Sequence, residues 1–507
     1  MHLPAGDEVG LVGGVEPAGV VGERTHAGSL TDPVHRPSGL RSLAAVSTPD
    51  DPSRTDLTPV PASVEREFTG REDAAREYTA REVWRSRPVR RLLLASFALY
   101  AGVALQATAL LKQAFDLTGN EADIGFIGLA EFLPAALLVL VTGSVADRFS
   151  RKLVALAAVG GELVCSIALA VYAFSGPTSV GPLFVIAFLY GIGRAFQAPA
   201  IRSMPPMVAP EGGLPRTIAL FSGTWTAAVI VGPAASGFLY AIDPWVAYAG
   251  SSVLIAIGWL GLLTVRFVRQ PEPPDPDERP SLHSALEGLR FIRRTPVLLA
   301  AISLDLFAVL FGGAVALLPV IAEERLGVGD VAYGWLRAAP GIGAALMAVA
   351  IAVRPVRRRI GPTLLVSVGV FGVATVVLGF TRSYAVAFAA ILVLSAADMV
   401  SVFIRSSLVP LVTPDEKRGR VLAVENVFIG ASNELGAFES GIAAQAIGTP
   451  ATVVGGGIGT LVVVGVWAAV FPSLRRIDRF DDLDEVRAQS AAERAARRDG
   501  EGTDQGT

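Results

Sequence analysis

Residues 143–152 read GSVADRFSRK and place a short burst of charge between two long apolar segments. The preceding segment covers residues 124–141, and the following one covers residues 153–174. At a rise of about 1.5 Å per residue, each is long enough to cross a bilayer as an α-helix. The charged residues are therefore predicted to form a tight turn at one membrane face.

The whole chain has the composition of a polytopic membrane protein. Its 507 residues are 52% hydrophobic and its mean hydropathy is +0.52, which is too apolar for a soluble protein of this length. The apolar runs long enough to span a membrane are 92–115, 124–145, 153–174, 182–201, 217–241, 246–266, 297–321, 333–353, 362–380, 383–404, 421–447 and 451–471. The sequence therefore predicts an all-α membrane protein with about twelve transmembrane helices.

The net charge of −3 hides an uneven distribution of basic residues. The basic clusters that fall on one side of the predicted membrane lie at 87–91, 148–152, 202–216, 266–294, 354–359, 405–420 and 475–479. The opposite loops hold little beyond Lys112, Arg325 and Arg382. The positive-inside rule therefore predicts that both termini lie in the cytoplasm.

Composition also predicts how the chain is divided. The first 86 residues are rich in Gly, Pro, Ser, Thr and charge without sustained periodicity, as in disordered segments. Residues 270–280 hold five prolines among acidic residues, as in a linker. The predicted parts are a cytoplasmic tail at 1–86, a six-helix bundle at 87–269, a cytoplasmic linker at 270–295, a second six-helix bundle at 296–472 and a cytoplasmic tail at 473–507. The single cysteine, Cys165, cannot form an intrachain disulfide.

An internal repeat relates the two predicted bundles. Ile201-Arg202-Ser203 is matched by Ile404-Arg405-Ser406 at an offset of 203 residues. The further matches, at an offset of 204, are Pro206 with Pro410, Pro210 with Pro414, Arg216 with Arg420, and Ser236-Gly237 with Ser440-Gly441. Two six-helix halves of one ancestry are therefore expected.

The charged turn resembles the signature between helices 2 and 3 of the major facilitator superfamily. The matching residues are Gly143, Asp147, Arg148, Arg151 and Lys152, with Ser150 where family members usually have glycine. The resemblance implies a secondary transporter of two pseudo-symmetric bundles that works by alternating access.

Asp147 would then latch the cytoplasmic side by accepting hydrogen bonds at the N-terminus of a helix beginning near Val421. The basic residues of the turn would face anionic lipid and carboxylates. The alternative is that these charges serve only the topology of the chain.

Two further signatures of the superfamily are partly present. In the fifth span, Gly232, Pro233 and Gly237 resemble the antiporter signature, which has glycine at the positions of Ala228 and Ser236. A proline kink and small neighbours suit transport but suit ordinary helix packing equally. The signature favours export.

In the fourth span, Gly191, Gly193 and Ala195 match a small-residue pattern of the superfamily. The usual coupling arginine is replaced by Ala187, and Arg194 lies seven residues further on. Arg194 would therefore act at a different depth in the membrane.

Short sequence motifs resemble those of one branch of the superfamily. The phrases Leu304-Asp305, residues 316–319 (ALLP) and residues 334–336 (GWL) are similar to those of the bacterial enterobactin exporter and of macrolide and multidrug efflux pumps.

Ionisable residues inside the predicted spans are candidate functional residues, because each costs about 2.5–3.5 kcal/mol at mid-membrane on insertion scales. The candidates for proton coupling or the substrate cavity are Glu131, Arg194, Asp305, Asp398 and Glu434. Carboxylates in apolar surroundings bind protons more readily than in water, as reversible protonation near neutral pH requires. Each carboxylate could instead have a buried structural role.

The repeat places Arg194 and Asp398 at nearly the same depth, and helices 4 and 10 face each other in the resembled fold. These two residues are predicted to form an ion pair that closes the inner gate; the alternative is that each binds a neighbouring helix. Glu162 and Glu425 are expected to be structural or interfacial.

The predicted function is proton-coupled export of amphipathic small molecules, such as drugs or siderophore-like metabolites. The main alternative is uptake of a small polar nutrient, but the central helices are dominated by Ala, Leu, Val and Phe. A membrane enzyme is a weaker alternative, because all four histidines lie outside the spans and no nucleophile triad, phosphate loop or metal cluster is evident. No cofactor, metal or nucleic acid is expected, and the expected partners are the substrate, protons and lipid.

Arginine far outnumbers lysine among the 43 basic residues, which is typical of a high-GC bacterial source. The expected location is the plasma membrane of a bacterium, with the chain acting as a monomer.

Overall fold

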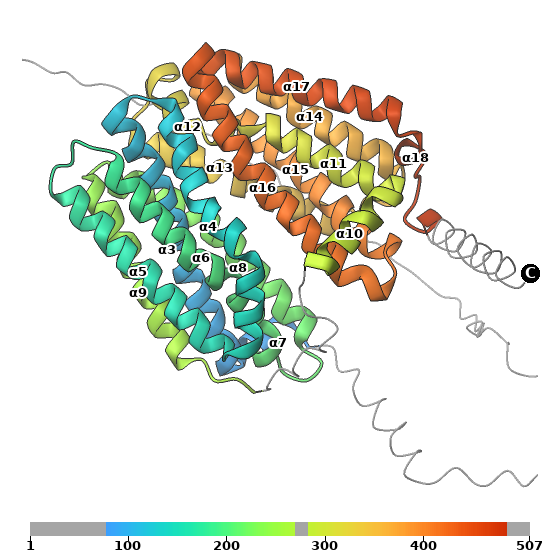
Figure 1. Cartoon of the computed structure of the whole chain (residues 1–507), viewed down its shortest axis with the longest axis horizontal. Helices are drawn as coiled ribbons and strands as arrows, with labels where there is room; N and C mark the ends of the chain where they lie inside the picture. The colour runs from blue at the N-terminus through green and yellow to red at the C-terminus, as the bar shows by residue number, and fades with distance from the viewer. Residues whose placement is uncertain (1–77, 269–281, 484–507) are drawn as a thin grey trace, which may run out of the picture. The chain divides into compact units, whose positions relative to one another are not determined.

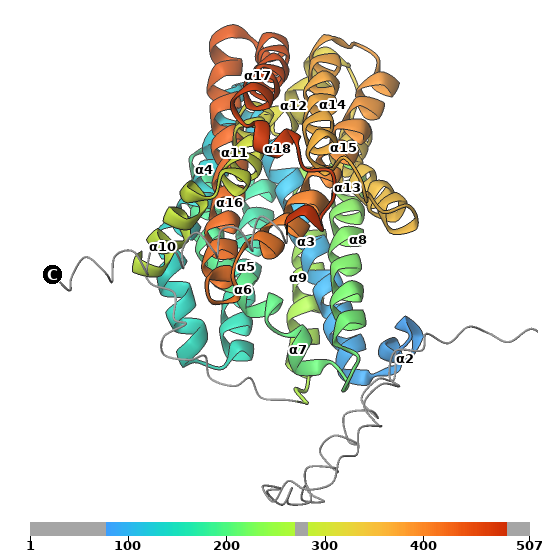
Figure 2. The same ribbon diagram turned by 90° about the vertical axis from the view of Figure 1, so that its right-hand side faces the viewer.

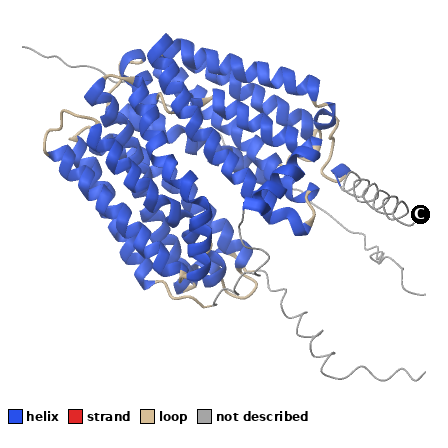
Figure 3. Ribbon diagram, viewed as in Figure 1, coloured by secondary structure: helices blue, strands red, loops and turns tan. Residues whose placement is uncertain are grey.

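The computed structural model describes residues 78–268 and 282–483 (Figure 1). The structure also does not describe the side chains of residues 139–141, 143, 144, 146–148 and 282–284. Most of the tail predicted at 1–86 and of that at 473–507 therefore falls outside it. The described residues form helices and connecting loops, with no strand among them (Figure 3).

The first half of the described chain contains six long helices and two short ones. The bounds are α2 (Ala80–Arg85), α3 (Arg87–Thr118), α4 (Glu121–Arg148), α5 (Arg151–Phe174), α6 (Gly181–Arg202), α7 (Pro205–Val208), α8 (Leu214–Tyr240) and α9 (Pro244–Thr264). Helix α2 lies within the predicted disordered tail. It starts with a capping box, in which the side chain of Thr79 accepts from the backbone N–H of Glu82 and the Glu82 side chain accepts from that of Thr79.

The second half has the same plan, with one broken helix. Its elements are α10 (Leu282–Arg294), α11 (Pro296–Phe311), a 3₁₀ turn (Gly313–Val315), α12 (Leu318–Val320), a π-helical turn (Ile321–Arg325), α13 (Asp330–Val353), α14 (Ile360–Phe380), α15 (Tyr384–Val412), α16 (Asp415–Ile447), α17 (Thr449–Val470) and α18 (Pro472–Arg475). Helix α10 lies within the predicted linker. Helix α16 begins at Asp415, earlier than the expected start near Val421.

The twelve predicted spans correspond to twelve long helical segments of the described chain. Ten of these are long and apolar enough to cross a membrane. The other two, α4 and α16, carry Glu131 and Glu434 in their interiors. Large apolar side chains also cover outer faces, for example Phe174 at 72% and Val353 at 81% exposure, as expected for helices surrounded by lipid.

The two halves repeat the same helix packing. In the first half, α3 packs on α8 and α9, α5 packs on α6 and α9, and α4 packs on α6. In the second, α11 packs on α16 and α17, α14 packs on α15 and α17, and α13 packs on α15. This arrangement confirms the predicted fold class of two pseudo-symmetric six-helix bundles (Figures 1 and 2). The exact domain boundaries stay a prediction.

The largest contacts between the halves are those of two helix pairs, α8 with α13 and α4 with α16. A Cβ added to Gly237 would lie 2.8 Å from the Cα of Gly334, and one added to Gly441 would lie 3.1 Å from the Cα of Gly125. Only glycine allows such close backbone approach. Gly237 and Gly441 are equivalent in the sequence repeat, so the same ancestral position makes both contacts.

Candidate functional site

Arg194 lies in a polar cluster at the point where Gly191 of α6 lets α4 approach closely. A Cβ at Gly191 would overlap the carbonyl oxygen of Glu131, so α6 lies directly against α4 at this point. One turn along α6, Arg194 Nη1 donates to Glu131 Oε2 at 3.3 Å. The Arg194 side chain is 48% exposed and that of Glu131 is 11% exposed. The arginine is therefore anchored to α4 at one nitrogen only.

Glu434 of α16 brings the second half of the chain to this cluster. A Cβ at Gly128 would lie 3.2 Å from Glu434 Oε2, and Gly128 lies one helical turn before Glu131 on α4. Glu434 interacts electrostatically with both Glu131 and Arg194. We call Glu131, Arg194 and Glu434 the Arg194 cluster; it joins three of the five predicted candidates across the interface between the halves.

The other two candidates, Asp305 and Asp398, belong to a second cluster inside the second half. Arg405 Nη2 of α15 lies 2.9 Å from Asp305 Oδ1 of α11, and its Nη1 lies 3.5 Å from Glu425 Oε1 of α16. The side chains of these three residues are each less than 10% exposed. Asp398 interacts electrostatically with Asp305 and Arg405. This Arg405 cluster holds α11, α15 and α16 together.

The predicted pair between Arg194 and Asp398 is not the one this structure contains. Arg194 pairs with Glu131, and Asp398 faces the Arg405 cluster. The repeat led us to expect similar depths in the membrane for Arg194 and Asp398, but the carboxylate of Glu131 on the neighbouring helix α4 pairs with the arginine instead. Sequence reasoning counted Arg405 only as a topology charge and so missed the buried cation beside Asp398.

A third cluster, also missed from the sequence, connects the halves at the end of α3. Lys112 Nζ lies 2.8 Å from Glu323 Oε2 and 3.7 Å from Asp330 Oδ1, both in the second half. Lys112 also pairs with Asp116, whose other oxygen accepts from the Tyr240 hydroxyl at 2.7 Å. The available signal was a lone lysine on a side poor in basic residues, with acids at the end of one later span and at the start of the next.

The antiporter-like residues of α8 lie at helix contacts. A Cβ at Gly232 would lie 2.6 Å from the carbonyl oxygen of Ala101 of α3, and one at Gly334 would lie 2.8 Å from that of Pro233. Gly237 makes the contact with Gly334 already described. Gly232 therefore packs within the first half, while Pro233 and Gly237 face the second half, and none of the three presents a polar group to a ligand.

The charged turn joins α4 to α5 through Phe149 and Ser150. Gly143 and the side chains of Asp147 and Arg148 fall outside what the structure describes, so the Asp147 latch stays a prediction. Lys152 Nζ donates to the carbonyl oxygens of Leu263 and Val265, both at 2.8 Å. It thus caps the C-terminus of α9, as a cation does favourably, instead of facing lipid and carboxylates as expected.

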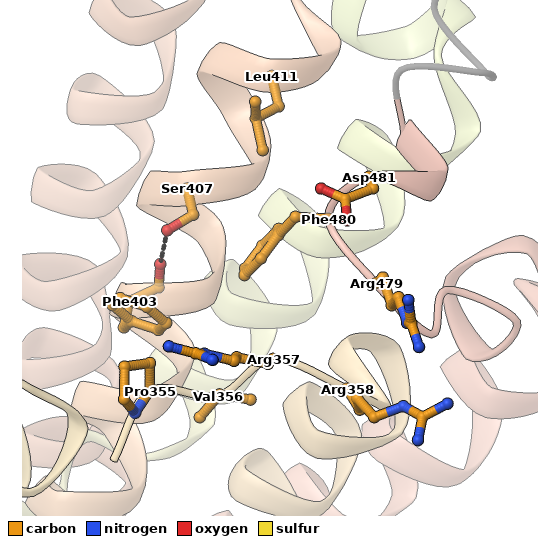
Figure 4. A pocket seen from close by; sticks show the side chains of 10 residues that line it. All are labelled: Pro355, Val356, Arg357, Arg358, Phe403, Ser407, Leu411, Arg479, Phe480 and Asp481. Atoms are coloured by element: carbon orange, nitrogen blue, oxygen red, sulfur yellow. Dashed lines mark hydrogen bonds between the residues drawn. The ribbon is translucent and has the colours of Figure 1, made fainter. Parts of the chain in front are cut away.

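Two cavities are lined by other residues. One, of about 620 Å³, is lined by Arg357, Arg358 and Arg479 together with apolar side chains such as Phe403 and Phe480 (Figure 4). The other, of about 600 Å³, is an apolar groove between α5 and α6 that includes Gly161 and Gly193. Neither is lined by any of the five candidate ionisable residues.

Comparisons with known proteins agree with this architecture. The sequence model of a family described as Major Facilitator Superfamily matches residues 92–437. Macrolide efflux protein A of Streptococcus pyogenes is 26% identical over 242 residues, covering 45% of this chain and 58% of that protein. The multidrug efflux pump Tap of Mycolicibacterium fortuitum is 26% identical over 416 residues, covering 77% of this chain and 97% of Tap.

A solved structure of a POT family transporter in complex with 5-aminolevulinic acid has the same fold. It superposes with a TM-score of 0.61 at 11% identity, over 77% of this chain and 97% of that one.

Proposed function

Because the chain belongs to the Major Facilitator Superfamily, we propose that it exports amphipathic small molecules from a bacterial cell in exchange for protons. The family is one of transporters rather than enzymes. The chain is a multi-pass membrane protein, and its relatives include pumps named for macrolide and multidrug efflux. The proposed substrates are amphipathic drugs. The proposed working unit is the monomer, since the two halves of one chain already pack against each other.

The observation that carries the proposal is the Arg194 cluster, in which Arg194 interacts with one carboxylate from each half. In apolar surroundings Arg194 can neutralise only one of the two carboxylates, Glu131 or Glu434, at a time. The second carboxylate is then neutralised by binding a proton. Protonation of Glu434 removes a negative charge from the interface between α4 and α16. Proton binding is thereby coupled to how tightly the two halves are held together.

The distribution of charge and contacts supports an inward-open conformation, the state in which an exporter takes up its substrate. We assign the face with the basic clusters to the cytoplasm, by the positive-inside rule. The Lys112 cluster and the Gly237–Gly334 and Gly441–Gly125 contacts then lie at the outer end, so the outer side is closed. Substrate enters from the cytoplasm, and the Lys112 pairs break when the halves rock to open the outside.

The test is transport by the full chain reconstituted in proteoliposomes, with the macrolide erythromycin as the probe. An imposed proton gradient should drive erythromycin against its concentration gradient, and a protonophore should stop this movement. Glu131→Gln should reduce driven transport, whereas Glu439→Gln, a change at an exposed carboxylate of the same helix as Glu434, should not. Erythromycin movement that does not depend on the proton gradient would overturn the proposed coupling. Erythromycin movement in the same direction as the protons would favour uptake.

A further inference from the structure

Glu162 of α5 is a buried carboxyl group with no role in the mechanism above. Its exposed fraction is 0%, and neither of its oxygens has a hydrogen-bond partner among the residues that the structure describes. An ionised carboxylate in such a position is among the costliest groups to bury, and buried polar atoms nearly always have partners. A neutral, protonated carboxyl group carries much less of this cost. Ordinary packing does not explain why an acid occupies this place.

The position of Glu162 relative to Arg194 suggests what the acid does. A Cβ at Gly193 would lie 2.9 Å from Glu162 Cγ, so the side chain rests against the backbone of α6 immediately before Arg194. Gly191 brings Glu131 to the same stretch of α6 from α4. The two glycines therefore place two carboxyl groups from different helices beside a single arginine.

The other groups around Glu162 leave Arg194 as its natural cation. The titratable groups that interact with it electrostatically are Arg194 and Tyr190 on α6, Glu131 on α4, Tyr100 on α3 and Cys165 on α5 itself. On α9, the polar side chains that bond to α5 are those of Ser251, Ser252 and Trp259, which do not titrate. Arg194 is thus the one cation in this set.

We propose that Glu162 is a second proton-binding residue of the transport cycle, protonated in this structure, and that Arg194 moves between Glu131 and Glu162. When Arg194 turns to Glu162, the Glu162 carboxyl group releases one proton to water, and Glu131, now without its cation, takes up one proton from water. The total charge of the cluster stays constant, so no uncompensated charge is created in the membrane. This inference rests on the proposed function and names a second carboxyl group through which protons pass.

The side chain of Arg194 has the freedom that this exchange requires. It is 48% exposed, and its ion pair with Glu131 uses one guanidinium nitrogen at 3.3 Å. A long side chain held at one point can change partners without a shift of the helix that carries it. The exchange therefore requires a rotamer change at Arg194, while α4, α5 and α6 keep their packing.

The first test measures protonation directly and needs no substrate. Infrared spectra of the full chain in liposomes at neutral pH distinguish protonated carboxyl groups from carboxylates. Glu162→Gln should remove part of the protonated-carboxyl band, and the matched control Glu439→Gln should leave the band unchanged. Glu131→Gln should also weaken the band, because Arg194, released from Glu131, can then pair with Glu162. A Glu162→Gln spectrum identical to that of the wild type would overturn the proposal.

The second test measures coupling with erythromycin as the probe. Glutamine has the size of a protonated glutamate, so Glu162→Gln should fold and elute from gel filtration like the wild type. Proton-driven accumulation should fall about tenfold while exchange down a gradient stays within about twofold, since only proton movement is lost. Unchanged coupling in Glu162→Gln would overturn the role of Glu162. A wild type that does not export tells against the proposed function instead, and the infrared result still decides the protonation of Glu162.

Discussion

At the scale of single residues, Arg405 shows how strongly one buried cation can determine local structure. It pairs with Asp305 and Glu425, and Asp398 is a third acid near it. Removing a buried cation leaves its carboxylates without compensation, which costs more than the pair contributes. The repeat supplies a comparison, because Arg202 occupies the equivalent position on α6 and is exposed.

We therefore expect Arg405→Leu to lower the free energy of unfolding by about 3–5 kcal/mol, the usual cost of breaking a buried ion pair from one side. Thermal unfolding in detergent measures the effect as a lower Tm. Arg202→Leu is the matched control and should change stability by less than about 0.5 kcal/mol, as exposed substitutions do. Equal losses in both variants would mean that the Arg405 cluster contributes nothing particular to stability.

Asp147 in the charged turn is a second test at this scale. We expect Asp147→Asn to impair transport and leave membrane insertion intact, because the substitution removes the proposed latch and keeps the cations that set topology. Erythromycin flux at matched expression checks this expectation. Normal flux would mean that Asp147 is not a latch.

At the scale of helices, the contacts between the halves depend on positions without side chains. A Cβ at Gly334 would lie 2.7 Å from the Cα of Gly237, whereas one at Gly369 of α14 would meet no atom within 4 Å. A methyl group at Gly334 must therefore push α8 and α13 apart, and the same group at Gly369 has open space.

We expect Gly334→Ala to reduce transport about tenfold and Gly369→Ala to leave it within about twofold, because only the first prevents close approach of two helices. Both variants gain the same helix-favouring methyl group, so differences in helix propensity cancel. Proteoliposome flux measures the difference. Equal activity of the two variants would show that the halves do not need this contact.

The sequence predicted the helices well because membrane spans are local features, readable from twelve apolar runs. It also predicted the pair of equivalent glycines, Gly237 and Gly441, since the repeat is visible in the residues themselves. The partners of the charged residues were not predictable in the same way. Lys112 and Glu323 are separated by 211 positions in the chain, and only the packing of the two halves brings them together.

At the scale of the whole chain, the Lys112 cluster is the ionic link between the halves at the proposed outer end. The lysine is 10% exposed and Glu323 is 52% exposed, so the pair is partly screened by water. Such a link can favour one conformation without preventing the other. Its removal should shift the balance between conformations more than it changes overall stability.

We expect Lys112→Met to increase the population of outward-open protein, since the charges that hold the outer end closed are lost. Spin labels at Thr118 and Gly329, in a Cys165→Ala background, lie on different halves. The distance between them, measured by double electron–electron resonance, reports the opening. The double exchange of Lys112→Glu with Glu323→Lys should restore part of the closed population. An unchanged distance distribution in Lys112→Met would mean that the cluster does not control the outer end.

The glycine contacts between the halves have a consequence for how the chain arose. Gly125 and Gly237 lie in the first half, and their counterparts Gly334 and Gly441 lie in the second, so each half carries both sides of the contact. Two identical half-length chains would therefore be self-complementary and would close on each other around a true twofold axis. The interface that joins the halves is therefore one that a symmetric homodimer of such half-length chains could form.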